Sequence, residues 1–173
     1  MNARLLIVDD EAEIRDMLSR HFRYLGFQVD TACDGIEAME KLAQARTEVV
    51  ISDIVMPRMG GVELLRAVRQ QYPMIHTIMI TGYMTLENAL GCMRHGADTC
   101  VFKPLEDLTE LEEAVEFAVG RLKRWQDKLR MLQANKFDVK KTLEGLITGS
   151  QWRKETYPLK LGPEELRLLV FYI

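Results

Sequence analysis

The fold is decided near the start of the chain, where a short apolar run meets three acids: Leu5-Leu6-Ile7-Val8-Asp9-Asp10-Glu11. Four apolar residues in a row, without alternating polar ones, are typical of a strand covered on both faces of a parallel sheet. The acids mark the end of that strand. Further strands are predicted downstream, at residues 27–32, 49–52, 74–80 and 99–102.

Helical patterns lie between the predicted strands. Apolar residues recur at helical spacing over residues 11–25, 35–45, 62–71 and 86–95, and again from residue 108 onward. This alternation predicts an α/β fold of the (βα)5 type, a doubly wound five-stranded parallel sheet with helices on both faces. A C-terminal α-helical extension is expected to follow it.

The composition excludes several classes of protein. Apolar residues make up 47% and charged residues 28% of the 173 residues, which rules out wholesale disorder. No apolar run approaches the ~20 residues that a bilayer requires, and the first run is too short for a signal-peptide core. The cysteines Cys33, Cys92 and Cys100 show no metal-binding spacing and indicate reduced thiols. We therefore expect a cytoplasmic protein without a membrane partner.

The residues that follow the predicted strands carry the chemistry. Asp9 and Asp10 follow the first strand, Asp53 the third, Thr81 the fourth and Lys103 the fifth. The carboxyl ends of parallel strands meet at one edge of the sheet, where ligands of such folds bind. Carboxylates gathered there repel one another unless a cation joins them, and oxygen ligands favour Mg²⁺.

A divalent metal, a lysine, a hydroxyl and several carboxylates together form a site suited to phosphoryl transfer onto one carboxylate. Each residue also has an ordinary explanation when taken alone. The acids can cap a helix, Thr81 can be a turn residue, and Lys103 can be a solvated surface side chain. Their joint placement at one edge favours the phosphoryl site.

At these positions the sequence resembles the receiver domain of bacterial two-component response regulators, the CheY-like family with flavodoxin-like topology. The resemblance covers about residues 3–120. It rests on the spacing of Asp9-Asp10, Asp53 followed by Met56-Pro57 and Gly60-Gly61, Thr81, and Lys103-Pro104.

The resemblance implies roles for these residues. Asp53 is the expected phosphoacceptor. Mg²⁺ is the expected cofactor, with Asp10 as its direct ligand beside Asp53 and with Asp9 acting mostly through water. The backbone carbonyl of Val55 is expected to complete the protein ligands. Thr81 is expected to bind a phosphoryl oxygen and to move on activation.

Lys103 is expected to pair with the phosphate, and its bond to Pro104 is expected to be cis. The phosphoryl donor that the resemblance implies is a phosphohistidine on a sensor histidine kinase or a phosphotransfer protein. Such a receiver catalyses only its own phosphorylation and dephosphorylation. We therefore do not expect an enzyme that acts on a separate substrate.

The sequence departs from the family at two places. Cys100 stands where an aromatic switch ring is usual, and Phe102 is expected to point to the other face of its strand. We therefore expect Cys100 or Tyr83 to take part in the readout of Thr81. Val55 and Tyr83 occupy the positions that tune dephosphorylation, and their bulky, non-acidic side chains predict slow autodephosphorylation.

The end of the receiver-like region continues into an apolar seam. It starts at residue 108, recurs every three and four residues, and includes Leu122, Trp125, Leu129 and Leu132. Such a seam predicts a parallel coiled coil and hence a homodimer. The helix is expected to end near residue 134. The alternative is an amphipathic helix folded back onto its own receiver.

The rest of the chain is basic. Residues 121–173 carry 12 lysines and arginines against 6 acids, whereas residues 1–120 carry 11 against 20. Asp138 is expected to cap a new short helix. Residues 159–166 resemble the opening of a LuxR-type helix-turn-helix output domain, whose recognition helix would lie beyond Ile173. The apolar end of the chain either docks in an oligomer or marks a truncated output region.

These patterns divide the chain into a receiver over 1–120, a helical stalk over 121–136 and a short helical or linker region over 137–173. They favour a response regulator of a two-component phosphorelay that regulates transcription, with DNA contact only through an output domain beyond this sequence. One alternative is a phosphatase-like enzyme that forms an aspartyl phosphate. Another is a receiver-only signalling module. A nucleotide-binding module is disfavoured because no glycine-rich loop follows the first strand.

Overall fold

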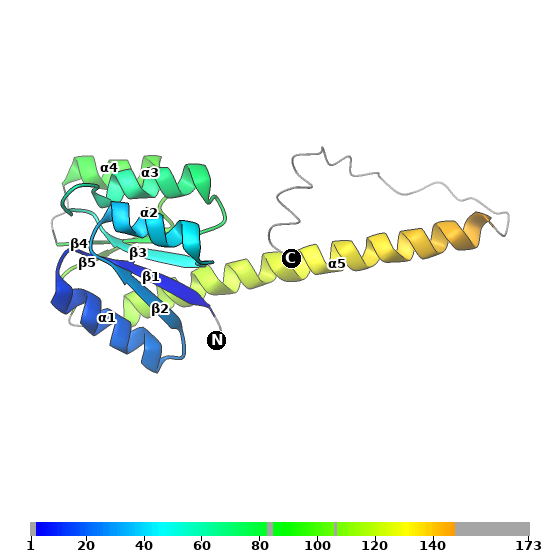
Figure 1. The fold of residues 1–173 in the computed structure, drawn as a ribbon, viewed down its shortest axis with the longest axis horizontal. Coiled ribbons are helices and arrows are strands. Elements are labelled where there is room, and N and C mark those ends of the chain that lie inside the picture. The colour runs from blue at the N-terminus through cyan, green and yellow to red at the C-terminus, as the bar shows by residue number, and fades with distance from the viewer. Residues whose placement is uncertain (1–2, 83–84, 106, 148–173) are drawn as a thin grey trace. The chain divides into compact units, whose positions relative to one another are not determined.

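The computed structural model describes residues 3–82, 85–105 and 107–147 (Figure 1). The strands in this part of the chain are β1 Arg4–Val8, β2 Gln28–Ala32, β3 Val49–Asp53, β4 His76–Thr81 and β5 Thr99–Phe102. The helices are α1 Ala12–Tyr24, α2 Gly35–Gln44, α3 Gly61–Gln71, α4 Leu86–Arg94 and α5 Thr109–Ile147.

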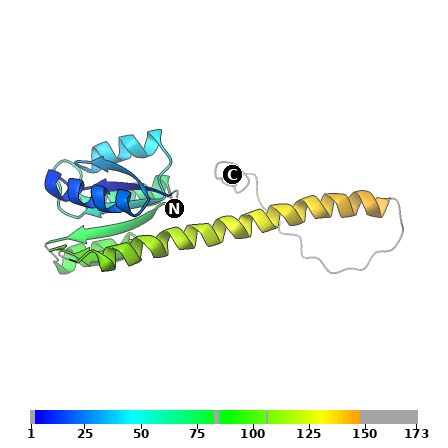
Figure 2. The same cartoon turned by 90° about the horizontal axis from the view of Figure 1, so that it is seen from below.

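The strands form one parallel sheet in the order β2-β1-β3-β4-β5. Helices α2, α3 and α4 cover one face, and α1 and α5 cover the other (Figure 1). Figure 2 shows α1 and the first turns of α5 on their shared face, where His21 Nε2 lies 2.7 Å from Glu112 Oε1. The predicted doubly wound (βα)5 fold is confirmed.

Strand β1 shows why the apolar runs are continuous. Leu5 and Ile7 pack into one core layer with residues of α1 and α5, whereas Leu6 and Val8 pack into the opposite layer with residues of α2 and α3. All four side chains are at most 1% exposed. Each such burial contributes about 1.5–3 kcal/mol, so a polar residue at any of the four positions would weaken the sheet.

The last helix differs from the prediction. Helix α5 is continuous to Ile147, so the expected end near residue 134 and the expected new helix at Asp138 are wrong. Residues 121–144 contain neither glycine nor proline, which are the residues that most often end a helix. One aspartate is a weaker signal than that uninterrupted run. The resemblance to a LuxR-type opening falls in 148–173, outside the described residues.

The chain divides into two units, Met1–Leu129 and Arg130–Ile173. The first unit holds the sheet, its covering helices and α5 up to Leu129. The finer division into a receiver, a stalk and an end region stays a prediction. Over the ranges that the structure describes, none of the helices is both long and apolar enough to span a bilayer.

Candidate functional site

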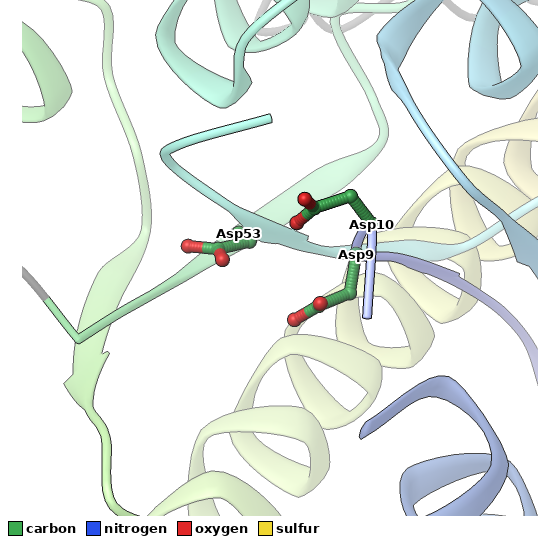
Figure 3. Close-up of side chains that lie close together, drawn as sticks. All are labelled: Asp9, Asp10 and Asp53. Atoms are coloured by element: carbon green, nitrogen blue, oxygen red, sulfur yellow. The ribbon is translucent and has the colours of Figure 1, made fainter. Parts of the chain in front are cut away.

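Three aspartates gather at the carboxyl edge of the sheet. Asp9 and Asp10 follow β1, and Asp53 is the last residue of the neighbouring strand β3. Ligand oxygens of the three lie within 4.8 Å of one another (Figure 3). Asp9 and Asp53 are buried, whereas Asp10 is exposed. The sheet thus brings the predicted acids together because adjacent parallel strands end at the same level.

Lys103 places one positive charge among these acids. It follows β5, and its Nζ donates to Asp9 Oδ2 and Asp53 Oδ2 at 3.0 Å each and to Glu11 Oε1 at 3.1 Å. The side chain is only 14% exposed. Burial by itself lowers the pKa of Lys103, but the hydrogen bonds to the three carboxylates outweigh it and raise the pKa above its ordinary value. The lysine is therefore charged at any physiological pH.

In Asp9 burial outweighs the hydrogen bonds in setting the pKa, whereas in Lys103 the hydrogen bonds outweigh burial. Burial raises the pKa of the Asp9 carboxyl above its ordinary value, although the hydrogen bond from Lys103 and the one from the Glu11 backbone N–H oppose that shift. Glu11 N donates to Asp9 Oδ1 at 2.9 Å, which fixes the carboxylate plane. The Arg15 guanidinium also donates to the carbonyl oxygens of Asp9 and Asp10, at 2.6 and 2.9 Å. This arginine holds the loop after β1 against the start of α1.

Asp53 is oriented by the backbone that follows it. Ile54 N donates to Asp53 Oδ1 at 2.6 Å, and Val55 N lies 3.4 Å from the same oxygen. The chain then turns back so closely that a side chain at Gly61 would come within 2.0 Å of the Asp53 carbonyl oxygen. Only glycine fits this approach, which explains Gly61, the second glycine of the Gly60-Gly61 pair. The hydrogen bond from Gly61 N to Ile54 O, at 2.9 Å, closes the loop.

Thr81 ends β4, and its side chain is buried. Asp53 pairs in register with Ile80, so Thr81 lies one residue further along the same edge. Lys103 N donates to Thr81 O at 2.9 Å, which ties the two strand ends together. The Lys103–Pro104 bond is cis, as the resemblance implied.

The residues predicted to tune dephosphorylation or to take part in the readout, Val55, Tyr83 and Cys100, differ in their surroundings. Val55 is 59% exposed beside the acid cluster, whereas Tyr83 lies outside the described residues. Cys100 is half-buried against the layer formed by α3 and α4, and burial raises the pKa of its thiol to about 11. A thiol with that pKa is overwhelmingly protonated near neutral pH.

The expected orientation of Phe102 is wrong. Val101 packs into the layer of α1 and α5, whereas Cys100 packs into the opposite layer. Residues two apart on a strand share a face, so Phe102 lies on the face of Cys100. It pairs in register with Thr81 and is 55% exposed. An exposed ring therefore stands beside Thr81, on the same face as the half-buried Cys100.

The sequence pattern assigns no separate role to Glu11, although the structure makes it the third carboxylate on Lys103. Its place in the acid run after β1 is the signal that could have indicated such a role. Glu11 is 61% exposed at its side chain, in contrast to Asp9 and Asp53. It is therefore the contact on Lys103 that is most easily exchanged.

The donor set fits a divalent cation of the Mg²⁺ type. Hard cations take carboxylate oxygens, and Mg²⁺ usually binds one or two carboxylates and keeps several waters. Asp10 and Asp53 supply such oxygens, and the exposure of Asp10 leaves room for water. Without such a cation, Lys103 is the basic side chain that contacts the Asp9 and Asp53 carboxylates in the part of the chain that the structure describes.

Comparison with known families gives one match over most of this region. Residues 5–116 match the response regulator receiver domain. That span includes all of the sheet except Arg4, the first residue of β1, together with the three aspartates and Lys103.

Curated relatives agree with this match. The regulatory protein AtoC of Escherichia coli is 35% identical over 149 residues, which cover 86% of this chain and 30% of AtoC. The DNA-binding transcriptional regulator NtrC of the same organism is 34% identical over 129 residues, covering 75% of this chain and 27% of NtrC. The chain thus spans less than a third of the length of these two relatives.

Solved structures show the same fold. A CheY-like receiver domain protein of Methanospirillum hungatei superposes with a TM-score of 0.69 at 30% identity, covering 72% of this chain and 98% of that one. The response regulator TrrA of Thermotoga maritima, solved in complex with Mg²⁺-BeF, gives a TM-score of 0.61 at 33% identity, covering 67% and 98%. By fold, edge chemistry and sequence, this chain belongs to the response regulator receiver domain family.

Proposed function

We propose that the chain is the receiver part of a two-component response regulator and that it accepts a phosphoryl group on Asp53. The observation that carries the proposal is the contact of Asp53 Oδ2 with Lys103 Nζ at 3.0 Å, next to two further aspartates within 4.8 Å. The donor is a phosphohistidine of a sensor kinase or a phosphotransfer protein.

The contacts of Asp53 suit a nucleophile that attacks phosphorus in line. Its two oxygens are held by the Ile54 N–H and by Lys103, so the carboxylate does not rotate freely. One oxygen forms the new bond to phosphorus while the P–N bond to the donor imidazole breaks. The electron pair stays on that nitrogen. Lys103 offsets the negative charge on the transferred oxygens.

Asp10 and Asp53 would hold Mg²⁺ directly, Asp9 would act mostly through water, and the Val55 carbonyl would complete the set. When bound, the metal offsets charge on the transferred phosphoryl group. The exposed Asp10 makes no hydrogen bond to Lys103 among those found in the described residues, which leaves its carboxylate for a metal.

Thr81 would bind a phosphoryl oxygen and shift toward it, and Cys100 or Tyr83 would take part in the readout. The buried position of Thr81 at the end of β4 supports the first part. Val55 and Tyr83 replace the polar residues that would guide an attacking water, so the aspartyl phosphate should be long-lived. The exposed side chain of Val55 beside Asp53 supports that inference.

Phosphorylation would act on a homodimer through the helical stalk, residues 121–136. Met131 and Leu132 are 68% and 53% exposed, which is consistent with a partner helix. Leu122 and Trp125 instead line a pocket within the unit Met1–Leu129. Contact with DNA, and regulation of transcription, would require an output domain. The cytoplasm is the proposed location.

The test is phosphorylation of the full chain by acetyl phosphate and Mg²⁺, followed by intact-mass spectrometry. We expect the mass of one PO₃ group on the wild type and on Asp16→Asn, an exposed acid of α1. Asp53→Asn should stay unmodified, as should the wild type in EDTA. Equal uptake by Asp53→Asn would place the phosphoryl group elsewhere and overturn the proposal.

A further inference from the structure

A second polar site lies at the opposite, amino edge of the sheet. A pocket of about 490 Å³ is formed where the end of α3, the start of β4, the loop before β5 and α5 meet. All of its lining residues belong to the unit Met1–Leu129. Its volume is within the range of about 300–1,000 Å³ that is typical of small-molecule sites.

The polar half of this pocket is organised around Asp98. Arg69 Nη2 donates to Asp98 Oδ2 at 2.7 Å, and His76 Nδ1 lies 2.8 Å from Asp98 Oδ1. Thr77 N donates to Oδ2 at 2.9 Å. One nitrogen of Arg121 reaches Oδ1 at 3.5 Å. Both oxygens of the Asp98 carboxylate thus have hydrogen-bond partners within the protein, so the group is not free to bind a cation.

The guanidinium groups around Asp98 do not have all of their hydrogen-bond donors paired. Among the described residues, the Nε of Arg69 is buried and has no hydrogen-bond partner. It lies beside Gly96, 3.7 Å from where a Cβ would stand, and Gly96 also lines the pocket. Arg121 is 51% exposed, and its contact with Asp98, at 3.5 Å, is the only polar contact found for it among the residues that the structure describes. Two guanidinium groups against one carboxylate leave a net positive charge, which favours an anion.

The other half of the pocket is apolar. Leu122 and Trp125, from α5, face Pro73 and Met74, from the segment that joins α3 to β4. The Trp125 ring is about half exposed, and Lys128 Nζ lies 5.3 Å from its centroid. This distance allows a cation–π interaction between the ammonium group and the electron-rich face of the indole ring. An aromatic surface and a guanidinium group within one pocket suit a flat ligand with a negative end.

From these observations we infer that the pocket binds a small aromatic carboxylate, whose carboxylate pairs with Arg121 and whose ring packs against Trp125 and Leu122. The site is separate from the acid cluster, because no pocket residue belongs to that cluster. It also depends on α5 beyond residue 120, since Arg121, Leu122 and Trp125 all come from that segment. Ligand binding would therefore join α5 to the base of the sheet.

The probe is 2-naphthoate, with 2-naphthalenemethanol as the neutral molecule of nearly the same shape. Both are titrated into the ¹⁵N-labelled full chain. We expect saturable shifts at the Trp125 indole N–H and the Gly96 amide, with a Kd for the acid about tenfold below that for the alcohol. Equal affinity for the two probes, or shifts that avoid these two residues, would overturn the inference.

Two matched variants locate the anion contact. Arg121→Gln should weaken naphthoate binding about tenfold and leave the alcohol unchanged, because it removes one charge-assisted contact. Arg124→Gln should leave both unchanged, since the Arg124 guanidinium points back to Gly120 and is outside the pocket. Both side chains are exposed, so neither change threatens the fold. An unaltered Kd in Arg121→Gln would contradict the inference.

Asp53→Asn separates this site from the proposed phosphorylation. That variant should bind naphthoate with the affinity of the wild type, because Asp53 lies at the other edge of the sheet. Loss of naphthoate binding in Asp53→Asn would show that the pocket is not an independent site.

Discussion

The two edges of the sheet are built on opposite charge patterns. At the carboxyl edge one lysine, Lys103, serves three carboxylates. At the amino edge one carboxylate, Asp98, serves Arg69, His76 and Arg121. The first cluster has excess negative charge and the second has excess positive charge. The carboxyl edge is therefore suited to a metal ion. At the amino edge Asp98 links α3, β4 and α5, and the guanidinium groups there can also pair with an anion.

The largest effect is expected from removing the central acid of the amino edge. Asp98→Ala leaves the partly buried Arg69 without its counter-ion and should cost about 3 kcal/mol of unfolding free energy. Asp10→Ala, at the other edge, removes a repulsive charge and should leave stability within about 0.5 kcal/mol of the wild type. Urea denaturation without Mg²⁺ compares the two. Similar losses in both variants would contradict the contrast between the edges.

The lysine at the carboxyl edge should be nearly as important when no metal is present. Lys103→Met leaves two buried aspartates unpaired and should cost about 2 kcal/mol in EDTA. Mg²⁺ should recover part of that loss, because it supplies the missing positive charge. Thermal unfolding with and without Mg²⁺ measures this, with Lys123→Met as the exposed control. A loss that Mg²⁺ leaves untouched would argue against a metal among these acids.

The pH dependence of stability should have opposite signs at the two edges. Burial raises the pKa of Asp98, but the hydrogen bonds from His76, Thr77 and Arg69 outweigh it and lower the pKa from 3.8 to about 2. Its stabilisation is therefore complete above pH 3.8 and is lost as the pH falls through 2. Asp9 has a raised pKa, so its ionisation opposes folding as the pH rises.

Asp98→Asn isolates the amino-edge part of this dependence. The difference in unfolding free energy between the wild type and Asp98→Asn should be about 2 kcal/mol at pH 6 and should approach zero near pH 2. Guanidinium chloride denaturation across that range provides the measurement. A difference that stays constant with pH would mean that the charge of Asp98 is not what stabilises the fold.

The smallest effect concerns Glu11, the exposed member of the three acids on Lys103. Glu11→Gln should free the lysine for a phosphoryl group and raise the affinity for BeF₃⁻ in Mg²⁺ by about two- to fivefold, as expected for an exposed ion pair. Glu13→Gln, in the first turn of α1, is the matched control. NMR titration reports the affinity. A decrease in Glu11→Gln would mean that Glu11 assists binding and does not compete with it.

Several features were predictable because they depend on local pattern. The apolar runs within β1, β3 and β4 predicted those strands, since a strand covered on both faces is apolar throughout. The edge strand β2, Gln28–Ala32, carries polar residues instead. The acids after β1, together with Asp53 and Lys103, were predictable as a cluster because parallel strands end at one edge. The end of α5 was not predictable from Asp138, because a capping residue acts only where the helix is already interrupted.

Other features depend on which segments meet in space. The contact between Glu11 and Lys103 joins residues 92 positions apart in the chain, and no local pattern encodes it. The group around Asp98 unites α3, β4, the loop before β5 and α5, while each residue by itself reads as an ordinary surface charge.

The sequence by itself determined the strand and helix order, the edge at which the acids meet, and the family resemblance. The reason is that hydrophobic periodicity and residue spacing act locally. Only the tertiary structure decided that Glu11 shares Lys103, that Phe102 faces the same side as Cys100, and that α5 contributes Arg121 and Trp125 to a pocket. These three features depend on how segments that are distant in the sequence pack together, because only that packing decides which side chains become neighbours.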